Sequence, residues 1–198
     1  MNKRNIFVVL LVIAITMVAM QLYAFANNGK STRSDAYQGK NVTRWQSSGD
    51  GASAWVETGT GFYSVYVSRV SPKSTRSDAY AGTRVYIDSY DWDTGEYGFA
   101  SYVIPDKDFV LDKNLDTAKL HTAVAEGRID VEWSATGAIS KSRSKSMYQS
   151  DHMKWMWQDS GSWRQAAATG TILGKRFDAT WGHLFTNRSM SMSIGNLY

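Results

Sequence analysis

The acidic side chains that lie closest together in the sequence are the first candidates for chemistry. Asp88, Asp91, Asp93 and Glu96 fall within the segment DSYDWDTGE. Carboxylates at nearly alternate positions followed by a glycine are typical of loops that bind Ca²⁺. The full spacing of such a loop is not met, because Gly95 comes one position early and the distal glutamate is missing. The segment is therefore either a weak calcium site or an acidic hairpin tip in which Asp93 binds the turn backbone.

A second pair of carboxylates, Asp130 and Glu132, lies in residues 128–135 (RIDVEWSA). Glycoside hydrolysis needs two carboxyl groups that face each other across a bond, roughly 5–9 Å apart. These two residues share one side of a strand-like alternation, next to Trp133. They, or the acidic segment around Asp88, are the residues that a secreted hydrolase would use. The alternative is a polar, solvent-facing row on a half-buried strand.

Other catalytic signatures are missing from the sequence. His121, His152 and His183 are scattered singly, and no HExxH spacing of a zinc site occurs. The chain has no G-x-S-x-G nucleophile motif, no cysteine and no glycine-rich phosphate loop. These absences favour a non-catalytic protein with no cofactor other than a weakly held Ca²⁺.

Aromatic residues are the remaining candidates for a binding site. The chain contains 8 Trp, 11 Tyr and 7 Phe, and flat aromatic faces suit both sugar rings and protein interfaces. We expect Trp92, at a hairpin tip, and Trp163, beside a Ser-Gly-Ser turn, to be exposed. Trp155 and Trp157 form a platform if their strand face is open. We favour the alternative, in which these two, together with Trp133 and Trp55, fill the core.

A basic segment offers a further binding surface. Lys141, Arg143 and Lys145 alternate with serine in residues 140–146 (SKSRSKS), so an extended chain would point three cations in one direction, toward an anionic polymer or a membrane surface. A solvated loop explains the same pattern. The formal net charge is only +4, and about +2 without the first residues, whereas nucleic-acid binding needs a concentrated basic face. We expect no nucleic-acid partner.

The beginning of the chain indicates where the protein works. Lys3 and Arg4 precede an apolar run that ends at Ala24-Phe25-Ala26, the arrangement of a secretory signal peptide. We expect residues 1–26 to be this leader, residues 27–35 a flexible lead-in and residues 36–198 one β-domain. An uncleaved membrane anchor is the alternative for the leader, and only then would the membrane be a partner. The protein is thus expected to be secreted or on the cell surface, and its lack of cysteine favours a bacterial or archaeal source.

The elements that must position these residues read as short strands separated by turns. Apolar and polar residues alternate in most segments, and Asp93-Thr94-Gly95-Glu96 predicts a hairpin turn with Gly95 at positive φ. Residues 115–126 fit either a strand or a capped helix, and we favour the strand because its neighbours are strands. The other expected strands are residues 62–70, 84–92, 97–104, 128–135, 147–158, 162–172, 176–185 and 189–194, with a turn around Leu173-Gly174-Lys175.

A short repeat interrupts this pattern. Residues 31–37 and 74–80 both read STRSDAY. The identity ends soon afterwards, and a repeat array would need its period to continue. Two similar segments that each lead into a strand explain the repeat better than a duplicated ligand-binding loop.

Together these features predict a single antiparallel β-sandwich or closed β-barrel of about 8–10 strands. The favoured function is an exported, non-catalytic domain that binds an extracellular glycan or a cell-envelope component through exposed aromatics and loops. A structural or self-assembling surface protein is the second hypothesis, and the secreted hydrolase is the third.

Overall fold

The structure is a computed structural model that describes residues 35–37, 40–71, 81–150 and 153–196. The expected leader lies outside the described residues. So does the second copy of the STRSDAY repeat, and of the first copy only Asp35–Tyr37 is described. The leader and the structural interpretation of the repeat therefore remain predictions from the sequence.

The described chain forms one 12-stranded antiparallel sheet that is not closed into a barrel. The strand order is β5-β4-β3-β2-β12-β10-β8-β7-β6, with β1 paired to β2 and with β9 and β11 paired to β10. The strands are β1 (Asp35–Tyr37), β2 (Lys40–Thr58), β3 (Gly61–Val70), β4 (Gly82–Asp91), β5 (Tyr97–Ile104), β6 (Phe109–Leu111), β7 (Thr117–Val124), β8 (Gly127–Ala135), β9 (Ser140–Gln149), β10 (Met153–Ile172), β11 (Lys175–Ala179) and β12 (Trp181–Asn196). The expected closed barrel and the expected number of about 8–10 strands are therefore wrong, whereas the all-β, antiparallel class is confirmed.

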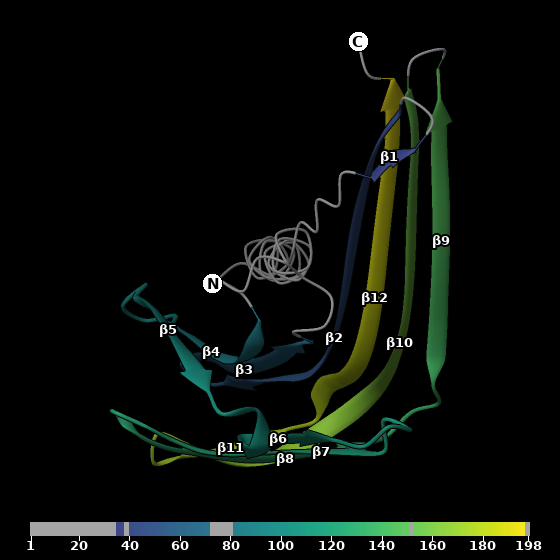
Figure 1. The fold of residues 1–198 in the computed structure, drawn as a ribbon. Helices are drawn as coiled ribbons and strands as arrows, with labels where there is room; N and C mark the ends of the chain where they lie inside the picture. The colour runs from purple at the N-terminus through teal and green to yellow at the C-terminus, as the bar shows by residue number, and fades with distance from the viewer. Residues whose placement is uncertain (1–34, 38–39, 72–80, 151–152, 197–198) are drawn as a thin grey trace.

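The body of the molecule consists of two parts of this sheet that face each other. The end of β2 joins β3, β4 and β5 in one layer, and the end of β10 joins β6, β7, β8 and β11 in the other (Figure 1). The indole N–H of Trp133 crosses between the layers and donates to the Ser53 carbonyl oxygen at 3.1 Å. The larger buried side chains between the layers are Val65, Val67, Val85, Phe109, Leu120, Ile129, Val131, Ile172 and Phe177.

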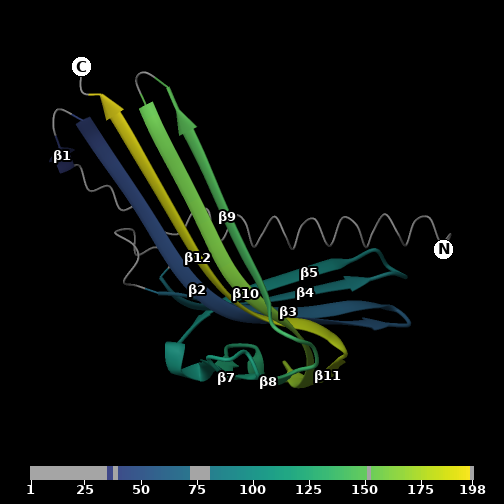
Figure 2. The same ribbon diagram turned by 90° about the vertical axis from the view of Figure 1, so that its right-hand side faces the viewer.

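An arm made of β2, β12, β10 and β9 rises from the body (Figures 1 and 2). Three of its strands are long, since β2, β10 and β12 span 19, 20 and 16 residues, and each runs from the body into the arm. No other described strand packs against either face of the arm. Apart from Ser47 and Ser189, which are buried, the arm side chains whose burial is described are half-buried or exposed. All of β9 from Lys141 onward is exposed.

Several sequence predictions about individual strands are confirmed. Residues 115–126 contain the strand β7 rather than a helix. The β4–β5 hairpin has Gly95 at φ 72°, as expected for a turn glycine. The side chain that binds the turn backbone is Asp91 rather than Asp93. Its Oδ1 accepts hydrogen bonds from the backbone N–H groups of Asp93 and Thr94, each at 2.9 Å.

Several expected boundaries are wrong, among them the break between residues 158 and 162, which lies inside β10. Residues 140–146 are not a loop but the first part of β9, because an edge strand satisfies its backbone on one side and leaves its polar side chains in water. The expected strand over residues 147–158 spans the end of β9 and the start of β10. Between them Ser150 and Met153 exchange hydrogen bonds that close a hairpin. The alternation of apolar residues continues across this turn, which hides it in the sequence.

A β-bulge at Thr180 explains why residues 176–185 do not form one strand. Ala168 pairs with Ala179 and Gln165 pairs with His183, so β11–β12 has one residue more than β10 over this stretch. The extra residue reverses the alternation. Phe177 and Ala179 face the core before the bulge, whereas Leu184 does so after it. Trp181 and His183 are thereby turned away from the core.

Leu120→Ala tests the two-layer core. Leu120 is fully buried in β7, so its truncation should lower the free energy of unfolding by about 3 kcal/mol through lost burial and the resulting cavity. Chemical denaturation measures this change. The matched control is Val110→Ala, because Val110 is 59% exposed on the neighbouring strand and its truncation should change stability by less than about 0.5 kcal/mol. Equal losses in the two variants would contradict the core as described.

Candidate ligand-binding surface

Four aromatic side chains meet where the arm leaves the body, and we call them the junction cluster: Trp55, Trp163, Trp181 and His183. The rings of Trp55 and Trp181 are stacked with centroids 6.4 Å apart. The centroid of the His183 ring lies 6.2 Å from that of Trp55, and it lies 5.5 Å from that of Trp163 in a T-shaped arrangement. Trp181 is 57% exposed and Trp163 44% exposed. The cluster is therefore an aromatic surface open to solvent.

The register of three strands brings these residues together. Trp181 is paired with Trp55 across β12 and β2, and His183 is paired with Gln165 across β12 and β10. All of them alternate with residues that face the core, namely Ala52, Ala54, Ala166 and Leu184. The junction cluster thus lies on the face of the sheet turned away from the core.

Further aromatic rings continue from this cluster across the same face. Phe185 stacks on Tyr66 at 5.7 Å, Tyr66 contacts Tyr86 at 5.7 Å, and Tyr86 contacts Phe99 at 6.3 Å. Phe185 has room because its partner position is Gly51, where an added Cβ would lie 2.5 Å from the Phe185 ring. Contacting rings therefore cross β12, β3, β4 and β5.

Polar groups lie among these rings. Cross-strand pairing places Ser53 and Gln165 beside His183, and Ser64 and Asp88 in the row of Trp55. Burial lowers the pKa of His183 below its ordinary value. Its imidazole is therefore neutral at neutral pH and offers one donor and one acceptor. Ser53 and Ser64 are themselves buried, so the groups of this surface that can hydrogen-bond a ligand's hydroxyls are Gln165 and His183.

The tryptophans singled out from the sequence lie in different places. Trp163 belongs to the junction cluster, and Trp133 is in the core, as the core alternative predicted. Trp155 and Trp157 are half-buried on the arm, on the same side of β10 as Trp163. The core alternative is thus wrong for Trp155 and Trp157, and it is also wrong for Trp55, because none of the three faces a second layer.

Trp92 lies apart from this surface. It follows β4 in the hairpin turn, where its backbone N–H donates to the Thr60 carbonyl oxygen at 2.7 Å. Its side chain is half-buried rather than exposed. Sequence reasoning missed Trp181 as a surface residue, although the alternation of Trp181, His183 and Phe185 in WGHLF carried the signal.

The acidic hairpin does not gather its carboxylates. The Asp91 carboxylate accepts hydrogen bonds from backbone N–H groups of the turn. These bonds, above all the one from Thr94, hold the pKa of the Asp91 carboxyl below its usual range. Asp88 accepts hydrogen bonds from the hydroxyls of Tyr97 and Ser64. Within the described residues, no three His, Asp or Glu side chains lie together as metal ligands would.

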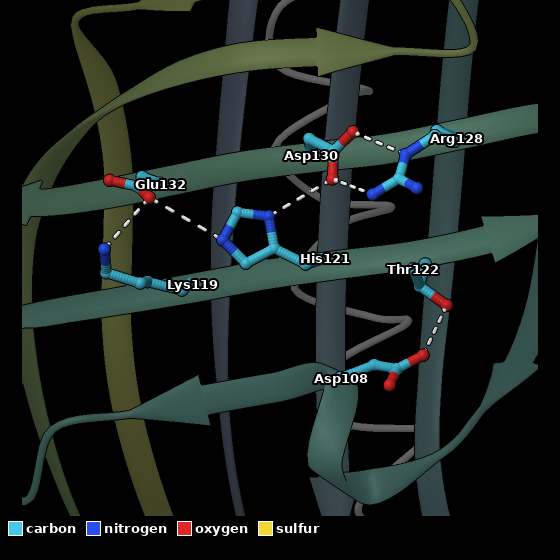
Figure 3. Close-up of polar contacts among 7 residues, drawn as sticks. All are labelled: Asp108, Lys119, His121, Thr122, Arg128, Asp130 and Glu132. Carbon is cyan, nitrogen blue, oxygen red and sulfur yellow. Dashed lines mark hydrogen bonds and ion pairs between the residues drawn. The ribbon is translucent and has the colours of Figure 1, made fainter.

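The Asp130 and Glu132 carboxylates form a cross-strand ionic network with β7 (Figure 3). Lys119 Nζ lies 3.0 Å from Glu132, and His121 lies between the two acids, 3.1 Å from Asp130 and 3.6 Å from Glu132. Arg128 pairs with Asp130 at 3.2 Å. Arg128 holds the pKa of Asp130 below its usual range, and Lys119 does the same for Glu132.

This network does not have the arrangement of a hydrolase site. Both carboxylates project from one face of one strand, whereas a glycosidase needs them on opposite sides of a bond. Both are also held ionised, so neither is a proton donor at neutral pH. The geometry fits the polar, solvent-facing row that was the alternative.

The pH dependence of stability tests the burial of His183. Because its folded pKa lies below 6.5, the unfolded chain takes up a proton first as the pH falls. The folded state should therefore lose stability as the pH falls through 6.5, until the folded pKa is reached. His183→Gln does not titrate and should lose less stability between pH 8 and pH 5 than the parent protein, measured by urea denaturation. An equal loss of stability in His183→Gln and the parent protein would contradict the burial of His183.

Comparisons with known proteins add no assignment to this geometry. The described part of the chain contains no helix with the length and apolar character needed to cross a membrane. No family model, no curated protein and no solved structure matches the chain.

Proposed function

We propose that this chain is an exported, non-catalytic protein that binds a glycan on the junction cluster. The observation that carries the proposal is the contact among Trp55, Trp181, His183 and Trp163, with two of the indoles about half exposed on an open sheet face. A pyranose ring has an apolar face that matches an indole, and its hydroxyls need donors and acceptors at the edge. Gln165 and the neutral His183 supply such groups.

The shape of the surface favours a chain over a small molecule. Small-molecule sites are concave pockets that enclose most of the ligand, whereas the junction cluster is part of an open sheet. The aromatic rings continue from Phe185 through Tyr66 and Tyr86 to Phe99. An extended polysaccharide could contact several of these rings at once, with hydroxyls placed over Gln165 and His183.

Self-assembly, the second hypothesis, could use the outer edge of β9, which pairs with no described strand other than β10. Two copies that join there in antiparallel fashion place side chains of the same face opposite each other. Centred on Ser144, Arg143 of one copy would oppose Lys145 of the other. Opposed like charges destabilise such pairs, and cations on an edge strand prevent edge-to-edge pairing. The charge pattern of β9 therefore favours the binding function over assembly at this edge.

Trp163→Ala/Trp181→Ala tests glycan binding. The double variant removes the two most exposed rings of the cluster, and each lost stacking contact costs about 1 kcal/mol. Retention on insoluble β-glucan, chitin and peptidoglycan should fall about tenfold or more for the polymer that the parent protein binds. Trp92→Ala is the matched control, because Trp92 lies in the β4–β5 turn, and it should bind like the parent. The proposal fails if the parent binds none of these polymers, or if the two variants are equally affected.

Export predicts a defined N-terminus. If residues 1–26 are a cleaved signal peptide, mass spectrometry of the protein recovered from outside its host cell should give a chain that begins at Asn27. A retained leader would instead place the same β-domain on a membrane tether.

A further inference from the structure

A shallow, open hollow of about 400 Å³ lies on the arm, over β10. Its floor is the backbone around Gly161, and its sides include Lys141 and Arg143 from β9 and Arg188 from β12. The hollow lies on the opposite face of the sheet from Trp163. This follows from the alternation of the strands, and also from the Cβ position of Gly161, which lies 3.5 Å from the Ser142 hydroxyl on the other face.

Two rows across three strands build this hollow. Arg143, Ser160 and Arg188 are directly paired in one row, and Lys141, Ser162 and Thr186 are paired in the next. Neighbouring strands lie about 4.8 Å apart, so the cations of β9 and β12 are roughly 10 Å apart with serine hydroxyls between them. The short Ser160 and Ser162 side chains leave space that larger residues would fill.

Among the described residues, the cations that β9 contributes to this face have no carboxylate partner. Lys141, Arg143 and Lys145 make no ion pair with any described residue. Asp50 lies on the same face, in the cross-strand row of Lys141, Ser162 and Thr186. Its carboxylate is held by Arg69 through two hydrogen bonds of 2.7 and 3.0 Å. The hollow therefore combines cations and hydroxyl donors with no carboxylate in its lining.

We propose that this hollow binds the anionic groups of an acidic polysaccharide, one that carries sulfate, phosphate or carboxylate along a sugar chain. Lys141 and Arg143 on one side and Arg188 on the other would contact the charged groups. The hydroxyls of Ser160, Ser162 and Thr186 would hydrogen-bond the sugar or its anion between them. A shallow, open hollow does not enclose its ligand and so accommodates a continuing chain.

Other polyanions fit this face less well. Single-stranded nucleic acids need aromatic rings for base stacking, and the lining of the hollow has none. A lipid surface is contacted by convex, apolar elements flanked by cations, whereas this site is a polar depression. The proposed acidic-glycan site is also separate from the junction cluster, since the two lie on opposite faces of the sheet, and either could exist without the other.

Dextran sulfate and uncharged dextran provide the test, because they share one sugar backbone. The purified protein should bind dextran sulfate and not dextran in isothermal titration at low salt, and the affinity should fall as salt screens the charges. Lys141→Gln/Arg143→Gln should weaken binding about tenfold or more, since each lost charged hydrogen bond contributes about 1.5 kcal/mol or more. Ser160→Ala/Ser162→Ala should weaken it by a smaller factor.

Matched controls separate this site from general charge effects. Lys107→Gln/Lys113→Gln removes the same charge from exposed positions outside the arm and should bind dextran sulfate like the parent protein. Equal weakening by the two charge variants would overturn the proposal. Polyglutamate or anionic phospholipid vesicles bound as tightly as dextran sulfate would also overturn it, because the site would then not recognise a sugar chain.

The junction variant distinguishes the two proposals. Trp163→Ala/Trp181→Ala should leave dextran sulfate binding unchanged, and Lys141→Gln/Arg143→Gln should leave retention on a neutral polysaccharide unchanged. Unchanged thermal unfolding midpoints would confirm that the variants are folded. Loss of dextran sulfate binding in the junction variant would contradict a separate acidic-glycan site.

Discussion

The backbone hydrogen bonds that join β2, β12 and β10 hold one register from the body to the tip of the arm. Both proposed binding surfaces depend on this register. It places Trp181 beside Trp55 and His183 beside Gln165 on one face, and Arg188 beside Ser160 on the other. A shift of one residue would exchange the two faces. Backbone pairing therefore decides which side chains lie together on each face, and the chemistry of those side chains comes second.

The arm differs from the body because it has no second layer in the described structure. In the body, one side of each strand is committed to the core, as Val65 and Val67 are in β3. Along the arm neither side is committed in this way, so its two faces carry different chemistry. Trp155 and Trp157 lie on one face, and the hollow beside Lys141 and Arg143 lies on the other. The two proposed binding surfaces are consequences of this freedom.

Local patterns in the sequence predicted the strands that bury one side. Residues 128–135 became β8, with Ile129, Val131 and Trp133 buried as their alternation indicated. The same reasoning failed along the arm, where alternation does not report burial. The turn between β9 and β10 was hidden there, and Lys141, Arg143 and Lys145 were expected in a loop although they belong to a strand.

The sequence by itself determined the β class, the β4–β5 hairpin with its turn glycine, and which residues carry cations, carboxylates and indoles. Only the tertiary structure decided which of them meet. Trp55, Trp163 and Trp181 come from three separate strands, and cross-strand register cannot be read from any one of them. The bulge at Thr180 is the sharpest example. One unpaired residue turns Trp181 and His183 outward, and without it the alternation set by Phe177 and Ala179 would direct both toward the core.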